Sequence, residues 1–189
     1  WGYDPTVKPL EYDLEKAKSL LAEAGYADGF STTIWTNDNP DRMKMAEYVQ
    51  AALKELNIEV KIEVMEWGTY LAQTAAGNHD MFILGWSTAT ADADYATYPL
   101  FHSSNVGEPG NRTFTKDAEL DKILEEARVE TDETKRKELY RQAQEKLVEI
   151  APMIYLLHTD LIVGVNDKVQ GFSISPSGMF QLKDVTLKE

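Results

Sequence analysis

The side chains of this sequence that could act as catalysts are few and lie in unrelated contexts. Nucleophilic catalysis needs a Ser or Cys beside a base that a third group holds. The chain has no Cys, and none of its serines lies in a Gly-x-Ser-x-Gly pattern. His79, His102 and His158 are typical of loop or packing residues. We therefore expect that the protein is not an enzyme, and a small hydrolase that pairs Asp92 with His102 stays as the alternative from another class.

Patterns that bind phosphate or metal are also missing from the sequence. The Gly107–Gly110 stretch is an ordinary turn rather than a phosphate loop. Asp92 and Asp94 lack the third oxygen ligand and the Gly of a calcium loop. Two carboxylates so close on one loop are also unsuited to glycoside hydrolysis, because those enzymes place them across a cleft. We expect no cofactor and no metal.

Two polar loops remain as candidate recognition surfaces. One runs from Asn37 to Arg42 after an expected strand, and the other runs from Ser87 to Asp94 after an apolar run that ends at Trp86. Ligands of open α/β sheets collect beyond the carboxyl ends of the strands. The second loop offers hydroxyls, backbone groups and carboxylates to a polar, zwitterionic ligand. Asp94 stands where a helix N-cap belongs, and burial of Trp86 in the core is an open alternative.

Composition limits the classes of partner. The 189 residues include 32 acidic and 19 basic side chains, for a net charge of −13. This balance argues against nucleic acid as a partner, because too few cations are present to neutralise a phosphate backbone. No apolar run approaches the roughly 18 residues that a membrane span needs. The length suits one compact unit with a substantial core.

The elements that position these loops alternate between helix and strand. Apolar residues recur at helical spacing from Leu14 to Ala24, after a cap at Asp13. Ile58–Val64 alternates apolar and charged residues, whereas Met81–Trp86 is apolar throughout, as in a strand buried on both faces. This alternation predicts an α/β fold with helices on the faces of a sheet. The expected helices are 13–25, 40–57, 67–76, 95–102, 117–129 and 133–150, and the expected strands are 31–36, 58–64, 81–86, 153–157 and 161–165, followed by a turn at Gly171-Phe172.

Short motifs spread over the chain resemble one known family. The stretches 12–18 (YDLEKAK) and 20–26 (LLAEAGY) are similar to the family segment YDPEKAKxLLAEAGY. The family is that of extracellular solute-binding proteins, family 5, the receptors of ABC importers for peptides and nickel. Further matches follow in the family's order: Glu66-Trp67, Tyr70-Leu71, Asp80-Met81, Leu84-Gly85-Trp86, Leu120-Asp121, Ala127, Thr131-Asp132, Arg136-Lys137, Leu139-Tyr140, Gln144, Val169 and Gly171-Phe172.

This resemblance implies a lobe with the type II periplasmic-binding-protein fold, in which a mixed sheet carries helices on its faces. Residues 1–189 would be the C-terminal lobe of a two-lobe receptor more than twice as long, with the tail from about residue 160 leading back toward the missing N-terminal lobe. The protein would be extracytoplasmic, in the periplasm or as a lipoprotein on a Gram-positive membrane. Its partners would be a peptide ligand, that missing lobe and the ABC permease subunits.

The resemblance also implies a role for particular residues. In dipeptide- and oligopeptide-binding relatives, an Asp shortly after the Gly-Trp pair holds the ligand's α-ammonium group, and this position is Ala89 here. An Arg that some relatives place three residues before the Trp is Ile83 here. Either Asp92 or the other lobe would then bind the amine. Arg42, near a helix N-terminus beside the first loop, is a candidate to pair with a ligand carboxylate, and an ordinary surface Arg is the open alternative; Asn111 and Arg112 have the same two interpretations.

The expected ligand is an extended oligopeptide, because the stretch around Trp86 is closer to the branch that binds longer peptides or glutathione. Glutathione, a nickel chelate, an opine and an oligosaccharide stay as alternatives. The candidate ligand-binding residues are Trp86, Ser87, Thr88, Ala89, Thr90, Asp92, Asn37, Arg42, Asn111 and Arg112.

Overall fold

Three parallel strands in the order β2-β1-β3 form the sheet of this protein. The structure is a computed structural model that describes residues 1–188. β1 (Ser31–Asn37) pairs along its whole length with β2 (Glu59–Met65), and it pairs on its other side with the short β3 (Met81–Phe82). The predicted strands 31–36 and 58–64 are thus confirmed to within a residue at each end.

The sheet is covered by helices that connect its strands. α2 (Pro40–Lys54) links β1 to β2, and α3 (Trp67–Ala75) links β2 to β3. α1 (Leu14–Glu23) precedes the sheet and buries none of its residues fully. The core of this unit unites strand and helix side chains, namely Ile34, Ala46, Ile58, Val60 and Ile83.

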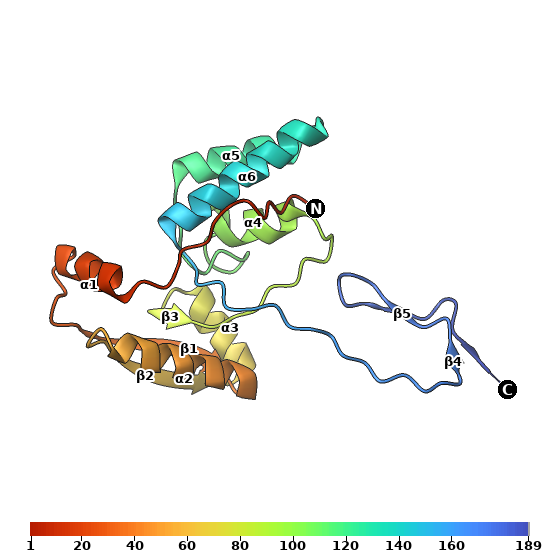
Figure 1. Ribbon diagram of the computed structural model, residues 1–189, viewed down its shortest axis with the longest axis horizontal. Helices are drawn as coiled ribbons and strands as arrows, with labels where there is room; N and C mark the ends of the chain where they lie inside the picture. Colours follow the sequence, from red (N-terminus) through yellow and green to blue (C-terminus); the bar gives the residue numbers. More distant parts are fainter. Residues whose placement is uncertain (189) are drawn as a thin grey trace.

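Three further helices make a second packing unit (Figure 1). They are α4 (Ala93–Phe101), α5 (Ala118–Val129) and α6 (Glu133–Ile150), and a short 3₁₀ turn, Ser103–Asn105, follows α4. On α6, Ala143 and Leu147 are buried, and Leu139 is partly buried on the same face. They pack with the other buried members of this core, Phe101, Leu120, Leu124, Ala127 and Tyr140.

Capping side chains begin these helices. Asp13 accepts from the backbone N–H of Lys16, so the predicted cap of α1 is confirmed. The predicted cap at Asp94 is wrong. α4 begins two residues earlier than expected, and Asp92 caps it by accepting from the N–H of Asp94 at 2.9 Å. The earlier start follows a turn in which Ala91 takes a φ of 53°.

Three strand predictions fail in part or in whole, because strands need partners. β3 stops at Phe82 rather than at Trp86, and Gly85 and Trp86 are exposed instead of buried on both faces. The predicted strands 153–157 and 161–165 are not formed, and Ile162 is 91% exposed. Their apolar pattern fits a strand, but nothing within residues 1–188 pairs with them.

The tail from residue 151 onward leaves the body in an extended path (Figure 1). Its strands form two antiparallel ribbons, and a bend at Gly171 (φ 74°) stands where the sequence predicts a turn. The ribbons are made of β4 (Val169–Gln170) with β7 (Thr186–Leu187), and of β5 (Ser173–Ile174) with β6 (Phe180–Gln181). Antiparallel pairing is thus confined to the tail.

Candidate ligand-binding site

The two loops that the sequence predicts as recognition surfaces lie together at the carboxyl ends of β1 and β3. Asn37 ends β1, and its Oδ1 accepts a hydrogen bond of 3.0 Å from Nη1 of Arg42. Nη2 of Arg42 lies only 3.3 Å from the point where a Cβ on Gly85 would stand. The parallel arrangement of the strands explains this meeting, because their carboxyl ends share one edge.

The chain that follows β3 has a free backbone. Ile83 is held firmly: its N–H donates to the carbonyl of Trp35 at 2.9 Å, and its carbonyl accepts from the hydroxyl of Tyr70 at 2.6 Å. Residues 84–87, which we call the edge segment, have no backbone hydrogen bond within residues 1–188. Gly85, Trp86 and Ser87 are exposed. The edge segment therefore presents unpaired donors and acceptors at the border of a sheet.

Trp86 is exposed and oriented rather than buried. Its side chain is 42% exposed, so the alternative of core burial is wrong. The indole Nε1–H donates to the carbonyl of Tyr95 at 2.7 Å, and the two rings lie 5.3 Å apart at 35°. Trp86 therefore offers a fixed aromatic face beside the free backbone of the edge segment.

The small residues after the edge segment form a turn. Thr88 accepts from the N–H of Ala91 at 3.1 Å, and the hydroxyl of Thr90 accepts from the N–H of Asp92 at 3.4 Å. Thr88 is partly buried, while Ala89 and Thr90 are exposed. This turn carries the chain from the edge segment to the start of α4.

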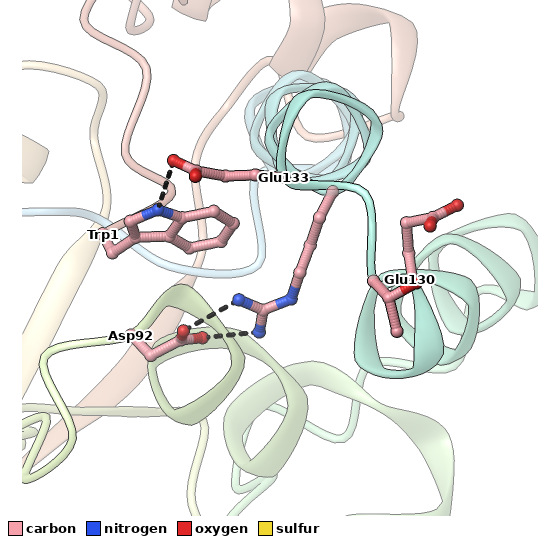
Figure 2. A pocket seen from close by; sticks show the side chains of 6 residues that line it. Trp1, Asp92, Glu130 and Glu133 are labelled. Atoms are coloured by element: carbon pink, nitrogen blue, oxygen red, sulfur yellow. Dashed lines mark hydrogen bonds and ion pairs between the residues drawn. The ribbon is translucent and has the colours of Figure 1, made fainter.

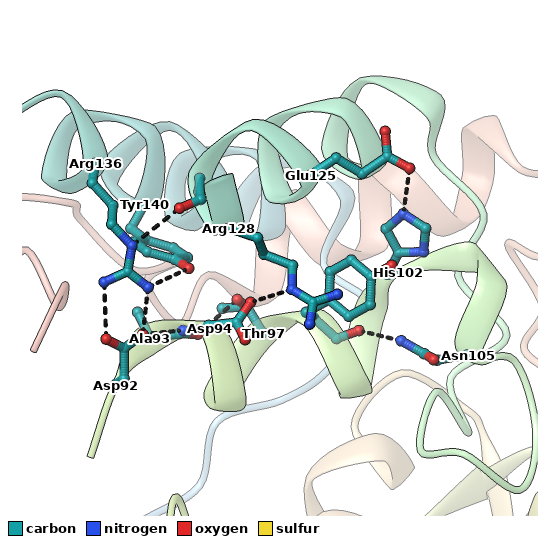
Figure 3. Close-up of polar contacts among 12 residues, drawn as sticks. Asp92, Ala93, Asp94, Thr97, His102, Asn105, Glu125, Arg128, Arg136 and Tyr140 are labelled. Carbon is teal, nitrogen blue, oxygen red and sulfur yellow. Dashed lines mark hydrogen bonds and ion pairs between the residues drawn. The ribbon is translucent and has the colours of Figure 1, made fainter. Parts of the chain in front are cut away.

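Asp92 is fully engaged by the protein itself. Its two carboxylate oxygens accept from Nη1 and Nη2 of Arg136, each at 2.9 Å, while it also caps α4 (Figure 3). The Arg136 hydrogen bonds are the main cause that lowers the pKa of Asp92. Because Arg136 neutralises it, Asp92 is not a free anion for a ligand amine. Sequence reasoning missed this partner, which lies 44 residues away.

An open pocket of about 440 Å³ lies beside this ion pair (Figure 2). Trp1 donates from Nε1 to Glu133 at its rim, and the ring of Trp1 lies 4.4 Å from the Arg136 guanidinium. The remaining residues of the lining are Asp92, Glu130 and Thr131. Within the lining Asp92 and Arg136 pair with each other, whereas Glu133 pairs with Lys137 outside it at 2.7 Å.

The structure separates the two residues of the hydrolase alternative. Asp92 precedes α4 and His102 follows it, so a helix of nine residues lies between them. At 1.5 Å per residue this spacing is about 14 Å, too far for a shared proton. His102 is instead buried, and its Nδ1 lies 2.7 Å from the hydroxyl of Ser104. The pairing of Asp92 with His102 is therefore wrong.

Asn111 and Arg112 serve the loop after α4 in different ways. Asn111 is fully buried, and its Nδ2 donates to the carbonyls of His102 and Thr115, so its amide holds the loop together. Arg112 accepts at its carbonyl from Nε2 of His79 at 3.0 Å. Its Nε is buried and has no hydrogen-bond partner within residues 1–188.

Arg42 brings a positive charge to this edge of the sheet. No carboxylate lies within salt-bridge distance of it in the part of the chain that the structure describes, although the sequence has 32 acidic residues. Its guanidinium lies 5.5 Å from the ring of Trp67, which is itself half exposed. Arg42 thus adds a positive charge without an anionic partner next to the edge segment. Trp67 and Tyr95 contact the candidate residues Arg42 and Trp86, and the sequence-derived set did not include them, although Glu66-Trp67 is one of the family motifs.

The described residues give no sign of a metal centre or a membrane span. No group of three or more His, Asp or Glu side chains within residues 1–188 is placed to hold a metal ion. Over the same residues, none of the helices combines the length and the apolar character that crossing a bilayer would require.

Comparison with known proteins assigns the class of this structure. Residues 1–108 match the family described as "Bacterial extracellular solute-binding proteins, family 5 Middle". The chain belongs to this family, as its motifs predict. Its fold is that of the type II periplasmic binding proteins, so the predicted α/β class is also confirmed.

Three relatives illustrate the similarity. Di/tripeptide-binding protein 1 of Pseudomonas aeruginosa (strain UCBPP-PA14) is 36% identical over 194 residues, which cover 99% of this chain and 36% of that protein. HbpA2 of Haemophilus parasuis has a TM-score of 0.87 at 34% identity, covering all of this chain and 38% of that one. The dipeptide binding protein of Pseudoalteromonas sp. SM9913 in complex with Met-Leu has a TM-score of 0.84 at 30% identity, with the same coverage. This chain therefore spans little more than a third of the length of such relatives.

Proposed function

We propose that this chain is the peptide-binding part of a receptor that serves an ABC importer. The observation that carries the proposal is the free backbone of the edge segment beside the exposed ring of Trp86. An extended peptide can add to such an edge by main-chain hydrogen bonds, while its side chains contact the neighbouring surface. Backbone recognition of this kind accepts many sequences, which suits the uptake of oligopeptides. The relatives compared here are named as binding proteins and not as enzymes.

Arg42 is the proposed contact for a ligand carboxylate. Its guanidinium is fixed by Asn37, lies close to Gly85 and lacks an anionic partner within residues 1–188. A guanidinium matches the geometry of a carboxylate through two parallel hydrogen bonds. With Ala89 at the position of the usual Asp and Asp92 held by Arg136, the ligand amine would be bound by the rest of the receptor.

The second half of the binding cleft would come from the longer protein. We expect residues 1–189 to act as its C-terminal lobe, whose exposed apolar tail packs on the missing N-terminal lobe. Tyr155, Leu161 and Ile162 are all exposed, and apolar side chains left in water along a tail are candidates for burial against another part of the receptor. Closure of the two lobes around a ligand would then be recognised by the permease subunits. This role requires an extracytoplasmic receptor, either periplasmic or held on a membrane by a lipid.

A different ligand in the same class of receptor is the second candidate. Relatives named glutathione-binding protein are 31% to 33% identical to this chain, and a heme-binding protein of Haemophilus influenzae is 34% identical. Glutathione is itself a short peptide with two carboxylates, so it would suit Arg42. Nickel chelates, opines and oligosaccharides stay as further possibilities of this class.

Native mass spectrometry of the full-length receptor, purified gently and without refolding, tests the proposal. Bound masses that fit peptides of several lengths would support it, and exchange of Trp86 for Ala should weaken their retention. Tyr48→Ala is the matched control, because Tyr48 is an exposed aromatic residue on α2. A single non-peptide mass would replace the peptide by another ligand of the same class.

A further inference from the structure

An ion pair with α6 anchors the chain shortly after the edge segment ends. After the edge segment the chain turns at residues 88–91 and reaches Asp92, the N-cap of α4. Both carboxylate oxygens of Asp92 accept hydrogen bonds from the guanidinium group of Arg136, near the start of α6 (Figure 3). A two-point contact of this type fixes orientation as well as distance.

Arg136 is itself held rigidly by two other elements. Its Nε–H donates to the carbonyl of Ala127 at 3.0 Å, in the last turn of α5. Its Nη2 donates to the hydroxyl of Tyr140 at 3.2 Å, and the ring of this fully buried Tyr140 lies 5.0 Å from the guanidinium. Arg136 therefore joins α4, α5 and α6 at one point, and its side chain is only 21% exposed.

Few other contacts restrain the chain between Ile83 and Asp92. The backbone of residues 84–87 is unpaired within residues 1–188. The restraints lie after it: Ala91 donates to Thr88, and the main chain of Trp1 bonds to the carbonyl of Ala91 at 2.7 Å and to the N–H of Ala93 at 2.9 Å, beside the cap at Asp92. Trp86 has one hydrogen bond, to Tyr95 in the first turn of α4. Both the path of the edge segment and the partner of Trp86 therefore depend on where α4 begins. That position is set at Asp92.

We propose that Arg136 is a positioning residue for ligand binding: through Asp92 it holds the edge segment and Trp86 in the arrangement that a peptide meets. This inference rests on the proposed function of the edge segment as a peptide-binding edge. The polar partners of Arg136 are Ala127, Asp92 and Tyr140, so its link to the segment runs through Asp92. Its contribution is to order the segment before binding, so that less conformational freedom is lost when a peptide pairs with it.

The variant Asp92→Asn tests the role of the ion pair without removing the helix cap. Asn caps helices as well as Asp does, so this variant keeps the start of α4 but removes the charge and one acceptor of the fork. Asp94→Asn is the matched control, since it makes the same chemical change two residues later. Asp94 pairs with Arg128 at 3.1 Å, an ion pair between α4 and α5 that does not touch the edge segment. Arg136→Lys is a second variant, which keeps the charge and loses the fork.

The experiment uses the full-length receptor labelled with fluorotryptophan, and Trp86→Phe identifies the fluorine resonance of Trp86. We expect this resonance to narrow in Asp92→Asn and Arg136→Lys, as the ring gains mobility, and to stay unchanged in Asp94→Asn. The resonance of the buried Trp35 should not move in any variant. The affinity for trialanine should fall about fivefold or more in the first two variants only.

An unchanged Trp86 resonance in Asp92→Asn overturns the positioning role, and so does a mobile Trp86 with undiminished affinity for trialanine. If Asp94→Asn lost as much affinity for trialanine, the losses would reflect lower stability of the fold in general. That result would also overturn the positioning role. If the wild-type receptor binds no peptide, the proposed function fails. The Trp86 resonance then still decides whether Arg136 immobilises the edge segment.

Discussion

The indole N–H of Trp86 donates to the main-chain carbonyl of Tyr95 at 2.7 Å, across the turn that separates the edge segment from α4. This bond satisfies the polar atom of a ring that remains 42% exposed. A tryptophan held in this way loses little freedom when a ligand stacks on it. The contact therefore makes Trp86 the aromatic platform of the proposed site.

Two replacements of Trp86 should weaken peptide binding to different extents. Trp86→Ala removes the platform, and we expect an affinity loss of about 1 kcal/mol, roughly fivefold. Trp86→Phe keeps an aromatic face but loses the bond to Tyr95, so its loss should be smaller. Isothermal titration of the full-length receptor with one tetrapeptide measures both. Equal affinity in wild type and Trp86→Ala would remove Trp86 from the site.

Arg42→Ala should reduce affinity roughly 10-fold to 100-fold for peptides with a free terminal carboxylate, because a charge-assisted pair is lost. Lys44→Ala is the control, since Lys44 is an exposed cation two residues away on α2. Peptides that end in an amide should bind the wild type more weakly and should not distinguish it from Arg42→Ala. A loss that is equal for acid and amide peptides would show that Arg42 binds another group.

Asn111→Ala should cost stability and leave peptide binding intact. The substitution leaves the carbonyls of His102 and Thr115 without their amide donor inside a buried loop. The cost should be about 2 kcal/mol in the free energy of unfolding. Denaturant unfolding measures it, together with a titration of the folded variant. A variant of unchanged stability that no longer binds peptide would return Asn111 to the ligand site.

High pH should destabilise the fold through two buried tyrosines. Burial raises the pKa of Tyr70 to about 12 and that of Tyr140 to about 12, against a model-peptide value of 10.0. Between pH 10 and 12 the unfolded chain releases these protons while the folded chain keeps them. The unfolded state then binds fewer protons, so stability falls as pH rises, by up to roughly 2 kcal/mol for each residue.

Denaturant titrations across this pH range, compared between wild type and Tyr70→Phe, check the effect. The variant loses the ionising group, so its stability should fall less steeply between pH 10 and 12. Its stability at neutral pH should be lower, because the carbonyl of Ile83 loses its donor. Parallel slopes for the two proteins would contradict the assignment to Tyr70.

The chain of residues 1–189, produced by itself, should bind peptides only weakly. If the other lobe supplies the rest of the cleft, this chain alone retains half of the contacts. We expect a dissociation constant of about 1 mM, a binding free energy of only about −4 kcal/mol. Chemical-shift titration with a tetrapeptide can measure affinities in this range. Sub-micromolar binding would show that this chain holds a complete site.

Local interactions determined what the sequence alone could predict. The helix starts at Asp13 and Pro40 and the alternating strand over 59–65 follow from capping and from side-chain period, which need only neighbours in the chain. The two polar loops follow expected strands, and a general rule for parallel sheets, whose strand ends share one edge, predicts that they meet. The family motifs added the class of protein.

The tertiary structure decided everything that depends on distant partners. β3 ends at Phe82 because only Met81 and Phe82 lie in register with Ile34 and Trp35 of β1, and no apolar pattern within 81–86 encodes that limit. Asn111 becomes structural because its loop folds around its amide, and Asp92 is neutralised by a guanidinium that lies 44 residues further along the chain. Such pairings form only when separate elements pack against one another. Composition and spacing therefore identify the polar residues, but they do not show which of these remain available to bind a ligand.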